Sequence, residues 1–204
     1  MITIVDYGMG NLGSVVNMFK KVGAQAEVTG DLDKIDKATK ILLPGVGAFD
    51  AAIDRIDKGG FREVLNKKAL QDNTPILGIC LGMQLLTRRS DEGTLSGLSW
   101  IAADTLKFTF KPEQNLKIPH MGWNFVREVN SSPLTQGLPE ESKFYFVHSY
   151  YVKADSEKSV IMQTNYGQYF DSVITNGNNI FGAQFHPEKS HKFGMKLFAN
   201  FAKI

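Results

Sequence analysis

The stretch from Pro75 to Leu86, with the sequence PILGICLGMQLL, most constrains the fold of this chain. It begins with an apolar run of strand length, Ile76 to Ile79, and the residues after Cys80 can form a helix. Gly78 and Gly82 lie two residues before and two residues after Cys80. A sharp strand-to-helix turn needs glycine at such positions, because larger side chains would collide where the chain folds back. The stretch therefore predicts a nucleophile elbow with Cys80 at its tip.

Cys80 is the only cysteine of the chain. The predicted turn puts its sulfur at the carboxyl end of a strand and the amino end of a helix. The free N–H groups and the dipole of that helix favour a thiolate, and the same N–H groups can bind an oxyanion. The alternative interpretation is a small core residue, as most unpaired cysteines are. The elbow spacing alone leaves both interpretations open, and the rest of the chain favours the nucleophile.

Composition limits the classes of protein to consider. The chain has 204 residues, of which 43% are hydrophobic, which suits one domain over residues 1–204 with a sizeable core. The net charge is only +2, so we expect no nucleic-acid partner. There is no signal-peptide pattern and no apolar run near the roughly 20 residues that span a bilayer. A single cysteine fits a reducing compartment, so we expect a cytoplasmic protein without a membrane partner.

The periodicity of apolar residues predicts the fold class. In the first half, short apolar strands alternate with amphipathic helices, which is typical of an α/β fold with a mostly parallel central sheet flanked by helices. The second half is richer in β-pattern and predicts an additional antiparallel portion. We expect strands near residues 1–5, 26–28, 41–43, 76–79, 125–129, 144–152, 160–163, 171–175 and 180–185, and helices near 14–22, 51–56, 61–70 and 192–202. We expect Asp50 to cap the second helix and residues 119–124 to form a turn.

A second site fragment, His186-Pro187-Glu188, follows the last predicted strand. A cysteine nucleophile needs a base, and the base needs an acceptor that orients it. In an extended segment residues i and i+2 face the same side, so His186 and Glu188 can address one partner. The alternative is a buried or surface histidine beside a solvated glutamate. The four histidines lack the spacing of metal ligands, so we predict no metal site.

The sequence GMGNLG at residues 8–13 matches the dinucleotide fingerprint G-x-G-x-x-G between a strand and a helix, and Glu27 or Asp31 lies at a usable distance for a ribose contact. These glycines can equally well serve only a tight turn. The rest of the chain offers no hydride chemistry, so an NAD(P)-binding oxidoreductase stays as the alternative of a different class. A second glycine loop, at residues 44–47, suits an oxyanion loop.

Together, GICLGMQ at residues 78–84 and HPE at 186–188 resemble the class I (triad) glutamine amidotransferases. Within that family, residues 6–12, 44–49, 119–124 and 145–150 are similar to the glutaminase subunits of imidazole glycerol phosphate synthases. The resemblance runs from residue 1 to the end of the chain.

The resemblance implies that Cys80 attacks the side-chain amide of glutamine, that His186 transfers protons, and that Glu188 orients His186. Backbone N–H groups of Val46 and Leu81 would hold the oxyanion. No cofactor is implied. The residues that would hold the glutamine are Gly47, Gln84, Ser149 and Tyr150.

The family also implies a partner, a (βα)₈-barrel cyclase that receives the ammonia in a heterodimer. The cyclase makes imidazole glycerol phosphate and an aminoimidazole carboxamide ribotide in histidine biosynthesis. Asn11, Trp123 and Lys189 match family positions near that interface. Two alternatives remain open: a paralogous glutaminase that feeds a related barrel for another amination, such as of a surface sugar, and a catalytically silent module with the same fold.

Overall fold

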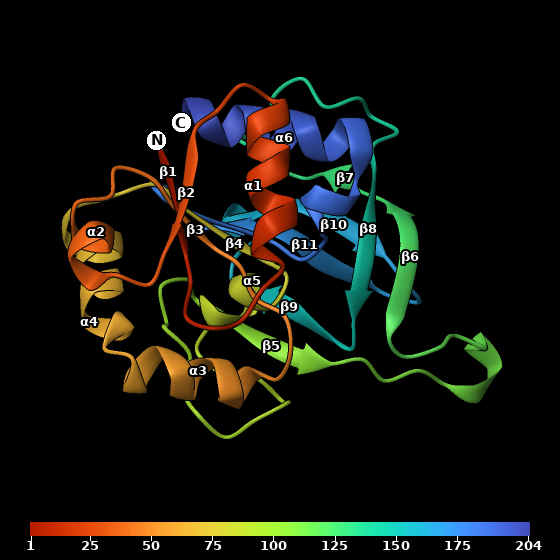
Figure 1. The fold of residues 1–204 in the computed structure, drawn as a ribbon. Coiled ribbons are helices and arrows are strands. Elements are labelled where there is room, and N and C mark those ends of the chain that lie inside the picture. Colours follow the sequence, from red (N-terminus) through yellow and green to blue (C-terminus); the bar gives the residue numbers. More distant parts are fainter.

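A computed structural model describes residues 1–204 and has a central sheet with helices on both faces (Figure 1). The strands are β1 (Ile2–Val5), β2 (Ala26–Thr29), β3 (Ile41–Leu43), β4 (Ile76–Ile79), β5 (Ala103–Lys107), β6 (His120–Phe125), β7 (Arg127–Glu128), β8 (Lys143–His148), β9 (Tyr150–Ala154), β10 (Val160–Asn165), β11 (Tyr169–Thr175) and β12 (Ile180–Ala183). The α-helices are α1 (Leu12–Lys21), α2 (Leu32–Asp36), α3 (Phe49–Lys58), α4 (Phe61–Asn66), α5 (Leu81–Leu85) and α6 (His191–Lys203). A π-helical turn, Lys67–Gln71, continues α4.

The main sheet has the strand order β2-β1-β3-β4-β12-β11-β10-β7. Strands β2, β1, β3, β4 and β12 are parallel, and β11, β10 and β7 continue the sheet in antiparallel fashion. Strand β9 pairs with β11 and β5, while β6 and β8 form a separate antiparallel pair. The predicted fold class, a mostly parallel sheet with an antiparallel portion in the second half, is confirmed.

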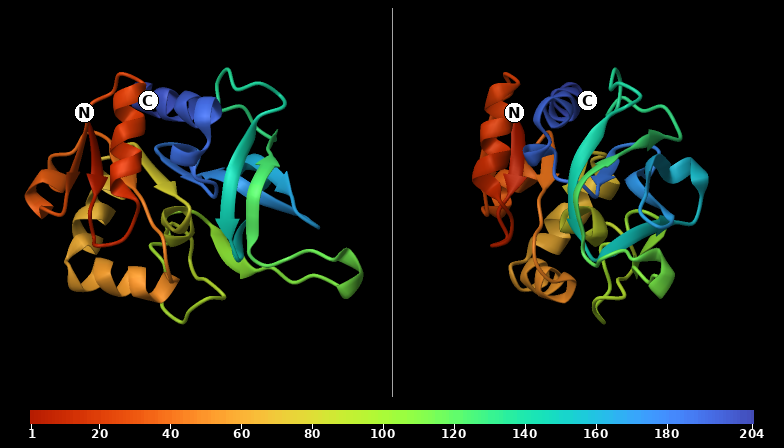
Figure 2. Two further views of the ribbon diagram at one scale, coloured as in Figure 1. Left: turned by 45° about the vertical axis from the view of Figure 1, so that its right-hand side comes forward. Right: turned by 90° about the vertical axis from the view of Figure 1, so that its right-hand side faces the viewer.

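The two faces of the sheet carry two hydrophobic cores. In β3, Ile41 and Leu43 pack into the core beneath α2 to α5, whereas Leu42 packs into the core beneath α1 and α6. This alternation follows from the two-residue period of a strand. Figure 2 shows α1 and α6 together on one face, and Phe19 packs against Phe198 between them with ring centroids 4.5 Å apart.

The prediction of a turn at residues 119–124 is wrong. Residues 120–125 form β6, which pairs with β8 from His120 opposite His148 to Phe125 opposite Lys143. Proline, glycine and asparagine signal a turn locally, but the hydrogen bonds to a strand distant in sequence override that preference. The strand expected at residues 125–129 is consequently divided between β6 and β7, and the β segment expected at 144–152 is divided between β8 and β9 at Ser149.

The prediction that Asp50 caps α3 is wrong. The N-cap residue is Ala48, and Asp50 lies in the first turn, where its carboxylate accepts hydrogen bonds from the backbone N–H groups of Thr94 and Leu95. The acidic residue therefore ties the start of α3 to a distant loop.

Among the helices, none is both long enough and apolar enough to cross a membrane.

Candidate active site

Cys80 stands at the sharp turn that the sequence predicts. Strand β4 ends at Ile79 and α5 begins at Leu81, as expected, and Cys80 has φ 55° and ψ −111°. A non-glycine residue at positive φ is strained by about 1–3 kcal/mol and is held there by its surroundings. The backbone N–H of Cys80 donates to the Ala183 carbonyl, so the elbow is tied to the adjacent strand β12.

Steric contacts explain the two elbow glycines. A Cβ on Gly78 would lie 2.6 Å from the Gly82 carbonyl oxygen, across the fold of the elbow itself. A Cβ on Gly82 would lie 2.0 Å from the Leu43 carbonyl oxygen at the end of β3. The first contact is the collision expected from the sequence. The second shows that α5 is also packed directly against the neighbouring strand.

The loop after β3 lies against the start of α5. A Cβ on Gly45 would lie 2.8 Å from the Gly82 backbone nitrogen and 2.9 Å from the Leu81 Cβ. Tyr7 holds this loop, because its hydroxyl donates to the Pro44 carbonyl at 2.6 Å. Burial, reinforced by Cys80, raises the pKa of Tyr7, so the tyrosine keeps its proton.

Several backbone N–H groups here have no acceptor within the chain, among them those of Val46 and Leu81. Both residues line the same cavity as Cys80. Unpaired donors beside a nucleophile are what an oxyanion site requires.

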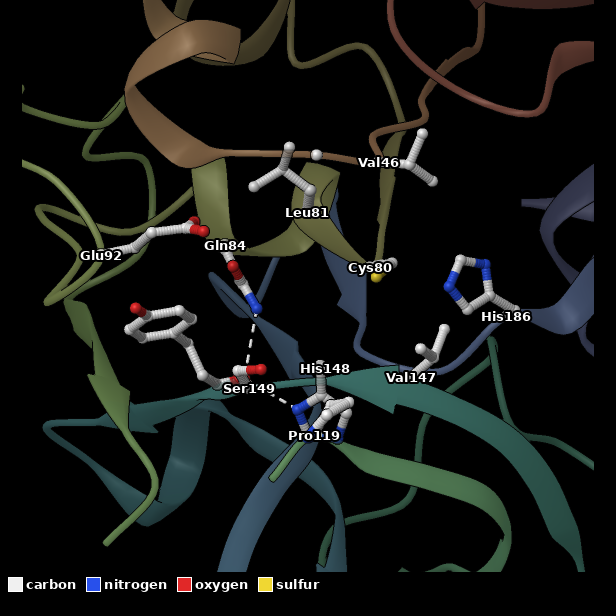
Figure 3. Close-up of a pocket in the computed structure, with 12 residues that line it drawn as sticks. Val46, Cys80, Leu81, Gln84, Glu92, Pro119, Val147, His148, Ser149 and His186 are labelled. Carbon is white, nitrogen blue, oxygen red and sulfur yellow. Dashed lines mark hydrogen bonds between the residues drawn. The ribbon is translucent and has the colours of Figure 1, made fainter. Parts of the chain in front are cut away.

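His186 and Glu188 are in direct contact, two residues apart as the sequence suggested. His186 Nδ1 lies 2.7 Å from Glu188 Oε1, and the two side chains are 3% and 2% exposed. The other ring nitrogen, Nε2, is buried without a hydrogen-bond partner. Figure 3 shows the imidazole and the Cys80 sulfur facing each other across the cavity. His186 comes from the turn after β12 and Cys80 from the end of β4, and these strands are neighbours.

The electrostatic surroundings favour a charged His186. Burial by itself would lower the pKa, but interactions with Cys80 and with the Glu188 carboxylate raise the pKa of His186 to about 10. This shift favours the protonated imidazole. In that form it stabilises a neighbouring anion and has a proton to give.

The cavity in front of Cys80 has a volume of about 340 Å³, within the range of small-molecule sites. Cys80, His186, Val46 and Leu81 line it, together with all the residues that the resemblance linked to substrate, namely Gly47, Gln84, Ser149 and Tyr150. Glu188 lies behind His186.

Gln84 is oriented by two hydrogen bonds. Its Nε2 donates to the Tyr150 carbonyl at 3.2 Å and to Gln184 Oε1 at 3.1 Å. Both amide hydrogens are thus used within the protein, and Oε1 of Gln84 is left as an acceptor for a ligand. Gln184 is fully buried, and its Nε2 lies 3.9 Å from the Cys80 sulfur.

Sequence reasoning missed Glu92, which also lines the cavity. Glu92 Oε2 accepts a hydrogen bond from the backbone N–H of Phe49 at 2.9 Å, which fixes the carboxylate at the start of α3. Burial raises the pKa of Tyr150, and the negative charges of Glu92 and Asp91 add to the effect. No local motif marks Glu92, because only the long-range packing of its loop against α3 brings it to the cavity.

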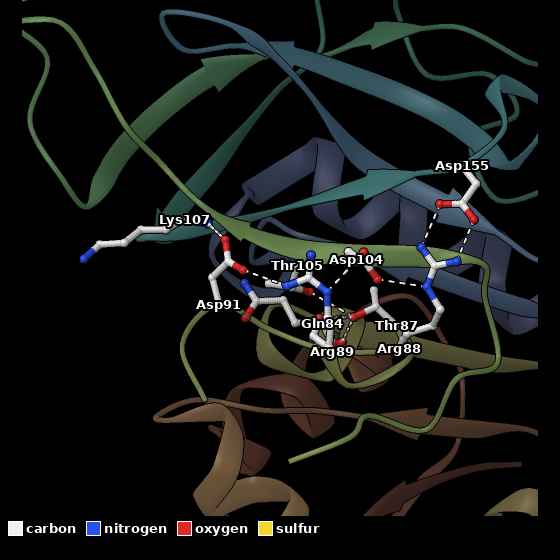
Figure 4. Close-up of polar contacts among 9 residues, drawn as sticks. All are labelled: Gln84, Thr87, Arg88, Arg89, Asp91, Asp104, Thr105, Lys107 and Asp155. Atoms are coloured by element: carbon white, nitrogen blue, oxygen red, sulfur yellow. Dashed lines mark hydrogen bonds and ion pairs between the residues drawn. The ribbon is translucent and has the colours of Figure 1, made fainter. Parts of the chain in front are cut away.

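A polar network behind α5 fixes that loop (Figure 4). Arg89 pairs with Asp91 at 2.9 Å, and Asp91 accepts a second hydrogen bond from the backbone N–H of Lys107 in β5. Arg88 pairs with Asp104 and Asp155. Both arginines lie beyond the end of α5, and they support the segment that carries Glu92.

Asn11, Trp123 and Lys189 are exposed and lie outside the cavity. Trp123 stacks on His191, with ring planes 2° apart, and Lys189 Nζ lies 5.6 Å from the Tyr145 ring centroid. Trp123 lies on β6, which pairs with β8, and β8 in turn contacts the turn that carries Lys189. Trp123 and Lys189 therefore belong to one surface beside the cavity.

The glycine fingerprint at residues 8–13 follows β1 and runs into the first turn of α1, as expected. The acidic residues proposed for a ribose contact are engaged elsewhere. Asp31 caps α2 by accepting from the backbone N–H groups of Asp33 and Lys34, and Glu27 forms an ion pair with Lys34. These contacts favour the interpretation of the glycines as turn residues.

The family model for class-I glutamine amidotransferases matches residues 3–204 of the chain. Imidazole glycerol phosphate synthase subunit HisH 2 of Methanococcus maripaludis is 53% identical over 203 residues, which cover 100% of this chain and 99% of the relative. The subunit HisH 2 of Pseudomonas aeruginosa is 46% identical, and the subunit HisH of Bdellovibrio bacteriovorus 44% identical, each with full coverage of both chains.

Solved structures agree on the fold. A glutamine amidotransferase structure superposes with a TM-score of 0.76 at 14% identity and covers 100% of this chain and 99% of its own. The structure of PurLQS from Thermotoga maritima gives a TM-score of 0.71 at 18% identity and covers 99% of this chain and 97% of its own. The chain therefore belongs to the class-I glutamine amidotransferases, and within them to the family of the imidazole glycerol phosphate synthase subunit HisH.

Proposed function

We propose that this enzyme hydrolyses glutamine to glutamate and ammonia through Cys80, His186 and Glu188, as the glutaminase subunit of an imidazole glycerol phosphate synthase. One observation carries the proposal: a cysteine at a strained elbow faces a buried His186–Glu188 pair across a cavity that also holds unpaired N–H donors. Family membership supports the same chemistry.

In the proposed first half-reaction, the Cys80 sulfur attacks the side-chain amide carbon of glutamine. The oxyanion that forms accepts hydrogen bonds from the backbone N–H groups of Val46 and Leu81. The carbon–nitrogen bond breaks, and the leaving nitrogen takes a proton from His186 Nε2. Ammonia departs and a glutamyl thioester remains on Cys80.

In the second half-reaction, a water molecule gives a proton to His186 Nε2 and attacks the thioester carbon. The carbon–sulfur bond breaks, which releases glutamate and restores the sulfur. Glu188 holds Nδ1 of His186 throughout, so that Nε2 always points toward the reacting atoms and the charged ring is stabilised.

The charges in the cavity suit the backbone groups of glutamine. We propose that the Glu92 carboxylate binds the α-ammonium group, since it lines the cavity and is fixed by Phe49. Gly47, Gln84, Ser149 and Tyr150 would supply the remaining polar contacts.

Changing Glu92 to glutamine removes the charge and keeps the shape. We expect the KM for glutamine to rise about 10- to 100-fold, which is the loss of a charge-assisted hydrogen bond, with kcat changed less than about threefold. Steady-state glutamate release measures both constants. An unchanged KM would contradict the role of Glu92. Glu63→Gln is a matched control, because Glu63 lies in α4 and not in the cavity.

Ammonia released into water would be protonated to ammonium, and an acceptor molecule could then no longer use it. We therefore propose a partner that takes the ammonia directly. The relatives are named as subunits, and the family partner is a (βα)₈-barrel cyclase. The outward face of β6 carries three exposed apolar side chains beside the cavity: Met121 (61%), Trp123 (42%) and Phe125 (59%). This stripe, with Asn11 and Lys189, is the surface we propose for that partner.

A second candidate is a paralogous glutaminase that feeds a related barrel. The numbered name HisH 2 of two relatives favours keeping it in view. One experiment separates the two candidates. Glutamate release is measured with the chain alone, then with a barrel cyclase and the nucleotide ligand of that cyclase. A steep rise supports the histidine pathway. Basal activity that the cyclase does not change points to the paralogue, and no activity in folded protein contradicts both.

A further inference from the structure

A chain of hydrogen bonds runs through two buried histidines that the proposed chemistry does not use. His148 Nδ1 lies 2.7 Å from the Tyr150 carbonyl oxygen, and His148 Nε2 lies 3.0 Å from His120 Nδ1. His120 Nε2 lies 3.2 Å from Asn124 Nδ2. The two imidazoles are 6% and 3% exposed. The chain connects the inward face of β6 with the wall of the cavity in front of Cys80.

The two ends of this chain determine where every proton lies. The Tyr150 carbonyl can only accept, so His148 Nδ1 carries a hydrogen. The Asn124 amide nitrogen can only donate, and it also donates to the Asn165 carbonyl at 2.9 Å, while Asn124 Oδ1 accepts from the Phe125 N–H at 2.8 Å. His120 Nε2 is therefore an acceptor. Between them, His120 Nδ1 donates to His148 Nε2.

A single arrangement satisfies all four groups: both histidines are neutral and both carry the hydrogen on Nδ1. The environment agrees with neutral rings. Burial lowers the pKa of His148 to about 3 and that of His120 to about 4, and the nearby His120 and His186 add to the shift of His148. A proton added to either ring would point a donor at a donor.

The Tyr150 carbonyl lies at the junction between β8 and β9, where the polypeptide backbone needs support. Ser149 separates β8 from β9, and on one side β5 holds this junction, because Lys107 pairs with Tyr150 and the Phe108 N–H donates to the Ser149 carbonyl. Two side-chain donors meet at the Tyr150 carbonyl, namely His148 Nδ1 and Gln84 Nε2. The carbonyl thereby links the cavity wall from β8 and β9 to α5, the helix that begins directly after Cys80.

From this geometry we propose that His120 and His148 are positioning residues for the glutamine site: locked as Nδ1–H tautomers, they hold the Ser149–Tyr150 wall and, through it, Gln84. The proposal rests on the proposed glutaminase function. It assigns these histidines no contact with the reacting atoms. It means that the glutamine site requires the whole chain of hydrogen bonds from Asn124 on β6 to the cavity.

The tautomers are measurable in the unmodified protein. Long-range ¹H–¹⁵N NMR spectra of protein labelled in its histidine rings, recorded at pH 7, are expected to show the Nδ1–H pattern for His120 and His148. Neutral histidines in water favour Nε2–H, so the pattern is diagnostic. Assignment uses the single variants His120→Phe and His148→Phe. An Nε2–H pattern, or a doubly protonated ring, at either residue would overturn the proposal.

The functional consequence is tested with His120→Phe, which keeps a ring of similar shape but breaks the chain of hydrogen bonds. Because the chain has one cysteine, alkylation by iodoacetamide reports on Cys80 alone. We expect the alkylation rate without glutamine to stay within about twofold of the original. The glutamine concentration that halves this rate should rise about tenfold, as one supporting hydrogen bond of about 1.4 kcal/mol is lost.

Tyr166→Phe is the matched control. The Tyr166 ring stacks on His120 with centroids 4.0 Å apart, but its hydroxyl donates to the Lys117 carbonyl and takes no part in the chain of hydrogen bonds. Protection by glutamine should be unchanged in this variant. Equal protection in His120→Phe and the original protein would overturn the positioning role alone. Absence of protection in the original protein would instead contradict the proposed glutaminase function.

Discussion

Replacing Cys80 with alanine is expected to lower the glutaminase rate by at least about 10⁴-fold, because the sulfur forms the covalent bond on which both half-reactions depend. Loss of a nucleophile is the largest single-residue effect that a mechanism of this kind allows. The change should leave the fold intact, since it removes one small atom from a side chain that is 8% exposed. Glutamate release and circular dichroism measure the two effects separately.

The other two members of the proposed triad serve as graded comparisons. His186→Ala removes the proton carrier and is expected to approach the loss seen with Cys80→Ala. In the unmodified protein His186 Nδ1 lies 2.7 Å from the Glu188 carboxylate. Glu188→Gln keeps the shape of this side chain but weakens that hydrogen bond, so we expect a smaller loss of activity. A Cys80→Ala variant that keeps glutaminase activity would rule out the proposed mechanism, whatever the other variants show.

Replacing Gly82 with alanine is expected to destabilise the protein by about 3–5 kcal/mol, because the new Cβ would lie 2.0 Å from the Leu43 carbonyl oxygen. The three atoms nearest to this Cβ, which belong to Leu43 and Pro44, are all backbone atoms, so no rotamer change of a side chain can relieve the contact. For a chain of this size the midpoint of thermal unfolding should fall by about 10 °C. Differential scanning fluorimetry measures the shift.

Gly13→Ala is the control for that prediction. Gly13 also lies in a helix, α1, but a Cβ there would meet nothing within 4 Å. Alanine should therefore stabilise the protein by up to about 1 kcal/mol, because glycine costs more backbone entropy in a helix. Equal destabilisation by the two changes would show that the packing of α5 against β3 is not what requires glycine.

The parts of the fold that local patterns determine could be predicted from the sequence. The bounds expected for β3 and β4 match the structure, because uniformly apolar runs between turn residues have few other solutions in a parallel sheet. The elbow was predictable for a similar reason: only a tight turn needs glycine on both sides of Cys80. His186 and Glu188 are paired as predicted, but the reason given was wrong: the segment is not extended, and a 3₁₀ turn at Pro187–Lys189 brings the two side chains together.

Features that depend on long-range pairing could not be predicted. Residues 120–125 have the composition of a turn and become a strand only because β8 supplies hydrogen-bond partners. Asp50 resembles a helix cap locally, yet it binds the distant backbone of Thr94. Glu92 has no motif at all, and it lines the cavity because that same loop folds against α3. The pairing of His120 with His148 likewise follows from strand register.

The most direct test of the account is alkylation of Cys80 with iodoacetamide, followed by intact-mass measurement and an assay of glutamate release in the same samples. With one cysteine in the chain, each adduct identifies the modified residue. The account predicts that activity falls in proportion to the fraction of alkylated chain, and that glutamine slows both changes equally. Fully alkylated protein that still releases glutamate at the original rate would contradict the assignment of Cys80 as the nucleophile.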